Sequence, residues 1–176
     1  MKDFRKSKAQ EFKFYLNLKS YRKSLLTNSN PYTPAVNLVF ALDEALKMMR
    51  EEGLDNIFQR HNKHKLAMSN AVKALNLKLF ADEKYLSPSI TAIKTEGIDA
   101  EEFRKTIKNN FDILLAGGQD HLKGKIFRVG HLGYVNDRDI ITVVSAISNT
   151  LLSLGKVTTQ QTGEALAVVS KYLAGN

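Results

Sequence analysis

The chain has 176 residues, of which 43% are hydrophobic and 25% charged, and it contains neither cysteine nor tryptophan. This is the composition of a folded, soluble domain, which can bury a core without disulfides or a structural metal. The absence of cysteine excludes thiol catalysis, cysteine-based zinc sites and iron–sulfur clusters. No apolar run approaches the roughly 20 residues of a membrane helix, and no apolar segment follows the basic N-terminus. We therefore expect a cytoplasmic protein with no membrane partner.

The net charge of +8 is concentrated at one end of the chain. Residues 1–25 carry eight Lys and Arg side chains against two acidic ones, whereas the remaining residues carry 18 basic against 16 acidic side chains. A basic amphipathic segment is more often a solvated face than a surface that tracks phosphates. Nucleic-acid binding through residues 1–25 is therefore the least favoured of the functions that the sequence suggests.

In chain order, residues 1–26 predict a short basic helix followed by an extended or mixed stretch over 12–18, where apolar and polar residues partly alternate. Two prolines then fall within residues 28–34, where they hold the backbone extended and prevent a helix from starting before them. We expect residues 1–34 to form a basic connector, which would join a missing large domain, and residues 35–176 to form a compact domain.

The connector is followed by two predicted helices. Residues 35–52 repeat apolar side chains at steps of three and four, and Gly53 supplies the stop. A second helix is predicted over about residues 55–75. Its expected inward-facing residues are Ile57, Phe58, Met68, Val72 and Leu75.

The rest of the chain mixes short strands with capped helices. Strands are predicted at 77–80, 89–95, 113–116 and 125–129. Three further helices are predicted: Asp99 and Glu102 form a capping box for one to about residue 110, Asn136 caps one through Leu154, and Thr158 or Thr159 starts one to Leu173. This order predicts an α+β fold in which helices cover a small, mostly antiparallel sheet.

Arg128 is the most informative candidate for binding. It lies between Phe127 and Val129 in a predicted strand, on the same face as Ile126, where an unpaired charge would be costly. A guanidinium can grip a carboxylate through two parallel hydrogen bonds, and the glycines at 130 and 133 would let a ligand approach. The alternative is an ion pair with one of the domain's own carboxylates, which the residues alone favour.

Three other features give weaker indications. The stretch from Gly118 to Lys125 has the wrong spacing for a phosphate loop and joins two predicted strands. His61 and His64 lie three residues apart on a predicted helix, but their neighbours are cationic, so we interpret them as surface residues and expect no metal site. Thr33 precedes a helix on a rigid loop, which suits either an anion contact or simple helix entry.

A family resemblance rests on several segments taken in order. They are Phe14–Leu18 with Tyr21, Pro31–Val36, Ala41–Leu46, Glu52–Leu54 with Arg60 and His61, Gly117–Gln119, and Leu122–Gly133. Together these segments resemble the C-terminal part of class V pyridoxal-phosphate aminotransferases, and the resemblance covers essentially the whole chain. This is the serine–pyruvate and alanine–glyoxylate aminotransferase group, which also contains proteins described as small subunits of a soluble hydrogenase.

The resemblance implies roles for two residues. Arg128 corresponds to the arginine that pairs with the α-carboxylate of the substrate, which reverses the preference for an internal ion pair. Thr33 corresponds to the threonine that reaches across the dimer interface to the cofactor phosphate of the partner subunit. We therefore expect an amino-acid or 2-oxo-acid substrate and a homodimer in the complete enzyme.

The resemblance also implies a missing part. Family members carry, upstream of the matched region, a large domain with the lysine that forms the Schiff base with pyridoxal 5'-phosphate. We assign no catalytic residue in this chain and expect it to bind no cofactor and to be inactive alone. The large domain could be supplied by a separate chain. The alternative is a non-catalytic accessory or dimerisation subunit with the same fold.

Overall fold

The computed structural model describes residues 14–174 and divides the chain into two compact units, residues 1–51 and residues 52–176. The domain boundary expected after residue 34 concerns a junction with a longer protein, and it stays a prediction. Among residues 14–174, no helix combines the length and apolar character needed to cross a membrane. The helices are α1 (Leu18–Leu25), α2 (Val36–Glu52), α3 (Leu54–Ala74), α4 (Ala100–Phe111), α5 (Asp137–Ser153) and α6 (Thr159–Leu173), and the strands are β1 (Lys78–Leu79), β2 (Ile90–Lys94), β3 (Ala116–Gly117) and β4 (Ile126–Gly130).

Tyr32 organises the loop between α1 and α2 in the first unit. Its ring centroid lies 4.8 Å from those of Phe14 and Tyr15, and its hydroxyl donates a hydrogen bond to the carbonyl of Phe14. The extended stretch predicted over 12–18 is wrong within the described residues, because residues 14–16 form a turn and α1 begins at Leu18, where the side chain of Asn17 caps it. The basic helix expected before this point lies outside the described residues.

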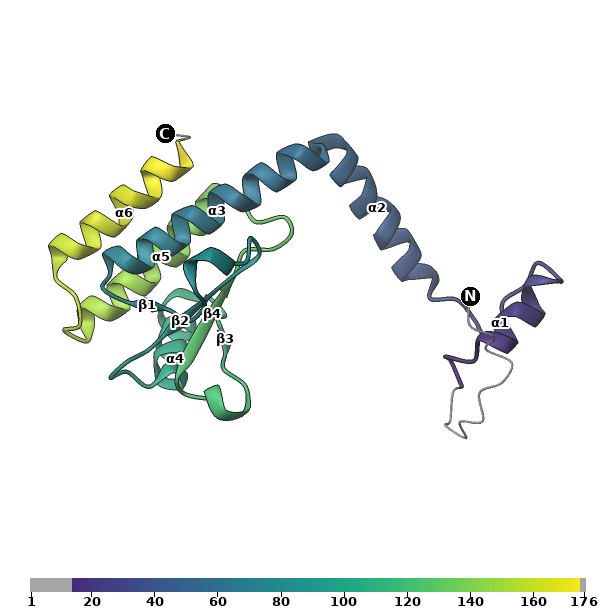
Figure 1. The fold of residues 1–176 in the computed structure, drawn as a ribbon, viewed down its shortest axis with the longest axis horizontal. Coiled ribbons are helices and arrows are strands. Elements are labelled where there is room, and N and C mark those ends of the chain that lie inside the picture. Colours follow the sequence, from purple (N-terminus) through teal and green to yellow (C-terminus); the bar gives the residue numbers. More distant parts are fainter. Residues whose placement is uncertain (1–13, 175–176) are drawn as a thin grey trace. The chain divides into compact units, whose positions relative to one another are not determined.

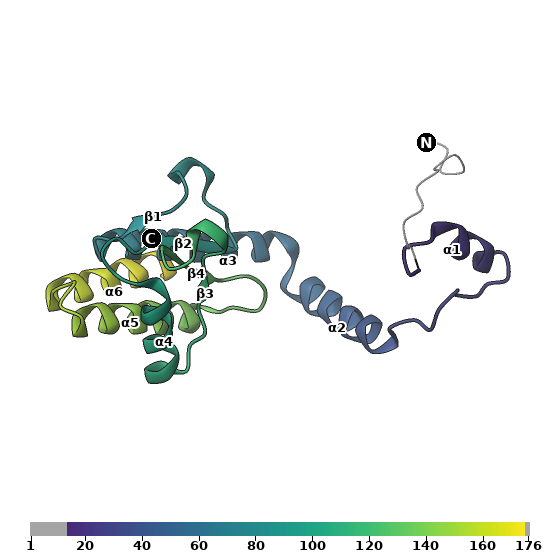
Figure 2. The ribbon, with the colours of Figure 1, turned by 90° about the horizontal axis from the view of Figure 1, so that it is seen from below.

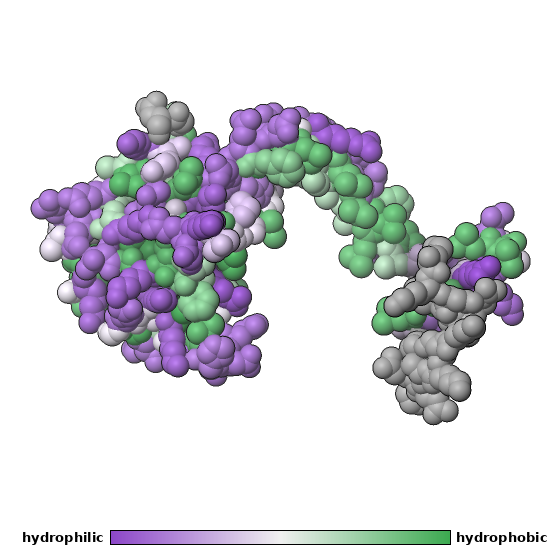
Figure 3. All heavy atoms as spheres, in the orientation of Figure 1, coloured by the Kyte–Doolittle hydropathy of each residue, from purple (hydrophilic) through white to green (hydrophobic). Residues whose placement is uncertain are grey.

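Apolar side chains extend along α2, and they form the green band of that helix in Figure 3. The helix predicted over 35–52 is confirmed, but none of its residues is buried. Leu38 and Phe40 leave 71% and 70% of their surface exposed. Large apolar side chains are thus exposed along α2, and none of the other residues in 14–51 covers them.

The second unit contains an antiparallel sheet with the strand order β1-β2-β4-β3, as Figure 1 shows. The expected α+β fold is therefore confirmed. The strand predicted at 113–116 is displaced, because only Ala116 and Gly117 pair with β4. Along β2, buried residues alternate with more exposed ones, as expected for a sheet with one covered face. The alternation on β4 holds from Phe127 onward, because Ile126 is also buried.

Helices cover the buried face of this sheet. Figures 1 and 2 show α3, α5 and α6 side by side, and α4 packs against β3 and β4. The rings of Phe103 on α4 and Phe127 on β4 lie 5.1 Å apart in the core. Of the residues expected to face inward on α3, Met68, Val72 and Leu75 are buried, Ile57 is half-buried, and Phe58 is 65% exposed. The prediction for Phe58 is wrong because the first turns of α3 precede the part that packs into the core.

Local capping signals explain where the helices begin. Asp99 accepts hydrogen bonds from the backbone N–H groups of residues 101 and 102 at the start of α4. The Glu102 side chain does not accept from the Asp99 N–H in return, so the predicted capping box is wrong in that half. Asn136 forms a capping box with Asp139 on α5, and Thr158 forms one with Gln161 on α6. These caps satisfy backbone donors that an uncapped helix would leave open, and they confirm the predicted starts.

Candidate functional site

Arg128 lies at the centre of β4, on the face of the sheet opposite the helices. Its neighbours in the chain, Phe127 and Val129, point to the covered face and are 1% and 3% exposed. Directly opposite Arg128 on the adjacent strands are Ala92 of β2 and Ala116 of β3. Side chains directly opposite one another in a sheet share a face, so the flanking groups are only methyls. The long side chain of Arg128 therefore stands between small neighbours.

One nitrogen of the Arg128 guanidinium forms a hydrogen bond within the sheet. Its Nε donates a hydrogen bond of 2.9 Å to the carbonyl oxygen of Gly117 on β3. Within residues 14–174, no carboxylate forms an ion pair with Arg128, and its Nη1 and Nη2 atoms are not among the buried polar atoms that lack partners. The internal ion pair favoured by the residues alone is thus not formed in the described part of the chain. The two terminal nitrogens have no hydrogen-bond partner among the described residues.

Two other half-buried arginines in the same unit show the contrast. Arg60 binds both carboxylate oxygens of Glu52, through Nε at 2.5 Å and Nη2 at 2.9 Å, and its Nη1 donates to the carbonyls of Gly133 and Val135. These hydrogen bonds from Arg60 lower the pKa of Glu52. Arg104 donates from Nε to the carbonyl of Leu115 and from Nη1 to Glu101, each at 2.8 Å. Both arginines are used in holding the fold.

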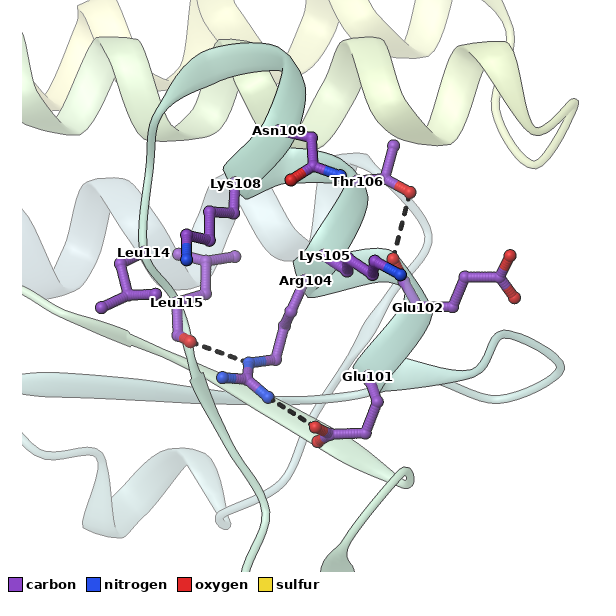
Figure 4. A pocket seen from close by; sticks show the side chains of 9 residues that line it. All are labelled: Glu101, Glu102, Arg104, Lys105, Thr106, Lys108, Asn109, Leu114 and Leu115. Carbon is purple, nitrogen blue, oxygen red and sulfur yellow. Dashed lines mark hydrogen bonds and ion pairs between the residues drawn. The ribbon is translucent and has the colours of Figure 1, made fainter.

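A groove of about 710 Å³ lies where α4 meets the segment that leads into β3 (Figure 4). Arg104 points along it, with Glu101 on one side and the carbonyl of Leu115 on the other. Gly117 lies against this ion pair, because a Cβ added there would be 2.6 Å from Nη1 of Arg104 and 2.7 Å from Oε1 of Glu101. Only glycine fits at this position without displacement.

His131 fixes the chain just after β4. It is fully buried, and its Nδ1 lies 3.1 Å from the carbonyl oxygen of Pro88 while its Nε2 lies 2.9 Å from the hydroxyl of Thr91. A carbonyl only accepts hydrogen bonds, so Nδ1 carries the proton and the hydroxyl donates to Nε2. Burial lowers the pKa of His131 to about 4, so the ring is neutral at pH 7. The role of this residue depends on contacts about 40 positions away along the chain.

The surface interpretation of His64 is wrong. Its side chain is fully buried, and its Nε2 lies 2.8 Å from Oδ1 of Asp137, the first residue of α5. Lys63 reaches the other oxygen of Asp137, also at 2.8 Å. Burial lowers the pKa of His64, although the hydrogen bond to Asp137 opposes that shift. In the described part of the chain, His, Asp and Glu side chains form no group of three or more that could hold a metal ion.

Thr33 belongs to the first unit, whereas Arg128 belongs to the second. Thr33 is exposed and directly follows Tyr32, whose ring is packed against Phe14 and Tyr15. The threonine is therefore presented to solvent next to an anchored residue. A phosphate contact by Thr33 stays a prediction.

The fold of this chain occurs in solved aminotransferases. The crystal structure of ureidoglycine–glyoxylate aminotransferase from Bacillus subtilis superposes with a TM-score of 0.79 at 28% identity, over 88% of this chain and 41% of that one. No family model matches the chain. The helices and antiparallel sheet of the second unit thus define an aminotransferase C-terminal domain.

Sequence comparison gives the narrower assignment. The soluble hydrogenase small subunit of Synechococcus sp. is 52% identical over 162 residues, which cover 92% of this chain and 42% of that protein. The serine–glyoxylate aminotransferase of Methylorubrum extorquens is 33% identical over 164 residues, covering 92% of this chain and 40% of the enzyme. The homologues of this chain are class V aminotransferases and soluble hydrogenase small subunits, and the chain spans about 40% of the length of these curated relatives.

Proposed function

We propose that this chain is the substrate-orienting domain of a class V aminotransferase, which transfers an amino group from an amino acid to a 2-oxo acid, and that Arg128 binds the substrate carboxylate. The observation that carries the proposal is the state of the Arg128 guanidinium. Whereas Arg60 and Arg104 are paired with carboxylates, Arg128 forms a hydrogen bond only through Nε, and its two terminal nitrogens have no partner among the described residues. Amino acids and 2-oxo acids both carry a carboxylate, so one fork can serve both substrates.

The geometry of Arg128 suits an end-on grip. Because Nε is already bonded to Gly117, the plane of the guanidinium is set by the sheet, and Nη1 and Nη2 form the remaining edge. A carboxylate that approaches this edge can accept two parallel charge-assisted hydrogen bonds. The methyl groups of Ala92 and Ala116 on the flanking strands leave room for the ligand. This arrangement would orient the carboxylate while the atoms next to it react.

Pyridoxal 5'-phosphate, the cofactor that the family resemblance implies, supplies an electron sink for chemistry at the substrate's α-carbon when it is bound. The described residues do not form a complete site for it. A phosphate is held by several donors at once, whereas Thr33 is one exposed side chain on a loop. We therefore derive no step through the cofactor. We propose only that Thr33 contacts its phosphate in a homodimer whose other parts hold the cofactor.

The test uses the full chain labelled with ¹⁵N in its arginine side chains and titrated with pyruvate, followed by nuclear magnetic resonance. We expect the Arg128 signals to shift with a dissociation constant of about tens of millimolar, since an exposed ion pair contributes only modest free energy. Arg128→Gln should abolish pyruvate binding, which is read on the methyl signal of pyruvate because this variant has no Arg128 side chain to observe. The matched control is Arg138→Gln, which removes an exposed arginine from α5 and should leave the response unchanged.

Two results would contradict the carboxylate role. One is an equal response of Arg128 to pyruvamide, which has the same size as pyruvate but no carboxylate. The other is an equal loss of the pyruvate response in Arg138→Gln and Arg128→Gln.

A second candidate is a non-catalytic accessory or dimerisation subunit. It is favoured by the identity of 52% to a soluble hydrogenase small subunit, which exceeds the identity of 33% to a serine–glyoxylate aminotransferase. If assembly is the function, the chain should sediment as a dimer or larger species and should show no response to pyruvate. A chain that sediments as a monomer would count against this candidate.

A further inference from the structure

The acceptor that orients Arg128 lies on a two-residue strand at the edge of the sheet. β3 consists of only Ala116 and Gly117, and it pairs with β4 alone at the edge of the sheet. One further backbone bond, from the N–H of Gly118 to the carbonyl of Ile126 at 3.2 Å, continues this pairing. A two-residue edge strand has few hydrogen bonds of its own to fix its position. The carbonyl of Gly117 therefore needs support from outside the ladder.

That support comes from α4. Nε of Arg104 donates a 2.8 Å hydrogen bond to the carbonyl of Leu115, the residue directly before β3 (Figure 4). Glu101, one turn earlier on α4, holds Nη1 of Arg104 at 2.8 Å. The ion pair also lies in close packing against Gly117, where a Cβ would require the ends of the Glu101 and Arg104 side chains to shift. Glu101 and Arg104 thus fix both the backbone before β3 and the covered side of Gly117.

In the described part of the chain, only one of the two carboxylate oxygens of Glu101 has a hydrogen-bond partner in this contact. Its Oε1 is buried and has no hydrogen-bond partner among the described residues, although Oε2 is bonded to Arg104. Native structures contain few buried acceptors without a partner. The close packing of Gly117 against Glu101 and Arg104 therefore leaves one carboxylate oxygen of Glu101 without a partner among the described residues.

We infer that Glu101 and Arg104 are positioning residues for the Arg128 fork, an inference that rests on the carboxylate function proposed above. The contacts form one chain: Glu101 holds Arg104, Arg104 holds the backbone of β3, and Gly117 of β3 holds Nε of Arg128. Glu101 and Arg104 act from the covered side of the sheet, whereas the fork of Arg128 opens on the other side. They determine its direction without touching the ligand.

The first readout is the exchange with water of the Arg128 Nε–H proton, measured by nuclear magnetic resonance on the full chain. The signal is assigned by its loss in Arg128→Lys. Arg104→Gln and Glu101→Gln should each raise the exchange rate about tenfold, because each loosens the Gly117 carbonyl that accepts this proton. Lys105→Gln is the matched control, since it removes one positive charge from the next, exposed position of α4 and should leave the rate unchanged.

The second readout is the affinity for pyruvate, and the two variants separate positioning from simple electrostatics. Arg104→Gln removes a positive charge, whereas Glu101→Gln removes a negative one. A purely electrostatic influence on an anion would weaken binding in the first variant and strengthen it in the second. Positioning predicts that both variants weaken pyruvate binding, by about 3-fold to 10-fold.

The outcomes distinguish the two proposals. If wild-type Arg128 does not respond to pyruvate, the carboxylate function fails, whereas the exchange rates still measure positioning. If both variants keep the wild-type exchange rate, or if Glu101→Gln binds pyruvate more tightly, positioning is overturned and the carboxylate function stands. If Arg104→Gln does not fold, Glu101→Gln decides, because it keeps the size of a side chain that is 42% exposed.

Discussion

The free energy of unfolding of the domain should depend on pH, because His131 is buried and its pKa is lowered in the folded chain. Its pKa falls from 6.5 to about 4 in the folded chain because the ring is buried. Between these values the unfolded chain binds the proton more tightly than the folded chain, so stability is present above pH 6.5 and is lost as the pH falls toward 4. The shift corresponds to a loss of about 3 kcal/mol between pH 7 and pH 4 from this residue.

Unfolding in urea, followed by far-ultraviolet circular dichroism because the chain lacks tryptophan, measures this dependence at pH 7, 6, 5 and 4. His131→Asn should be less stable than wild type at pH 7 by about 1–3 kcal/mol, because Pro88 and Thr91 lose a hydrogen-bond partner. Its stability should fall less steeply with acid, so the two proteins converge near pH 4. His121→Asn, which alters an exposed ring, is the control and should follow wild type. Equal slopes for His131→Asn and wild type would refute the reasoning.

Two substitutions test other contacts of the second unit by urea unfolding. Gly117→Ala should lower the free energy of unfolding by about 1–3 kcal/mol, because the new Cβ meets the Glu101–Arg104 pair, whereas Gly130→Ala, with no atom within 4 Å of its Cβ, should change it by less than about 0.5 kcal/mol. Asp137→Ala should cost about 1–3 kcal/mol, since it leaves His64 buried without its partner. An unchanged midpoint in either Gly117→Ala or Asp137→Ala would contradict the contact concerned.

Features with a local cause could be predicted from the sequence. Asn136 and Thr158 cap helices through atoms two or three residues away, so their patterns determine where α5 and α6 begin. The order of helices and strands, and with it the α+β class, follows from such local signals and from apolar spacing.

Features that depend on distant partners could not be predicted. The buried side chain of His64 is paired with Asp137, which lies 73 residues further along the chain. Patterns among neighbouring residues do not reveal a pair at that separation. The strand predicted at 113–116 is displaced because pairing with β4 selects Ala116 and Gly117.

The Arg128 site combines one feature that the sequence predicts with one that it does not predict. Its place in a strand could be predicted, since the apolar neighbours alternate with it. Whether its guanidinium would be paired internally depended on which carboxylates other arginines occupy. Glu52 binds Arg60 and Glu101 binds Arg104, so two carboxylates of the unit are already used. Residue type alone does not contain that information.

The most direct test is a crystal structure of the chain with pyruvate at about ten times its dissociation constant. We expect both carboxylate oxygens to lie about 2.7–2.9 Å from Nη1 and Nη2 of Arg128, while Nε keeps its hydrogen bond to the carbonyl of Gly117. Pyruvate bound elsewhere on the domain, or a carboxylate that displaces Gly117 from Nε, would contradict the proposed role of Arg128.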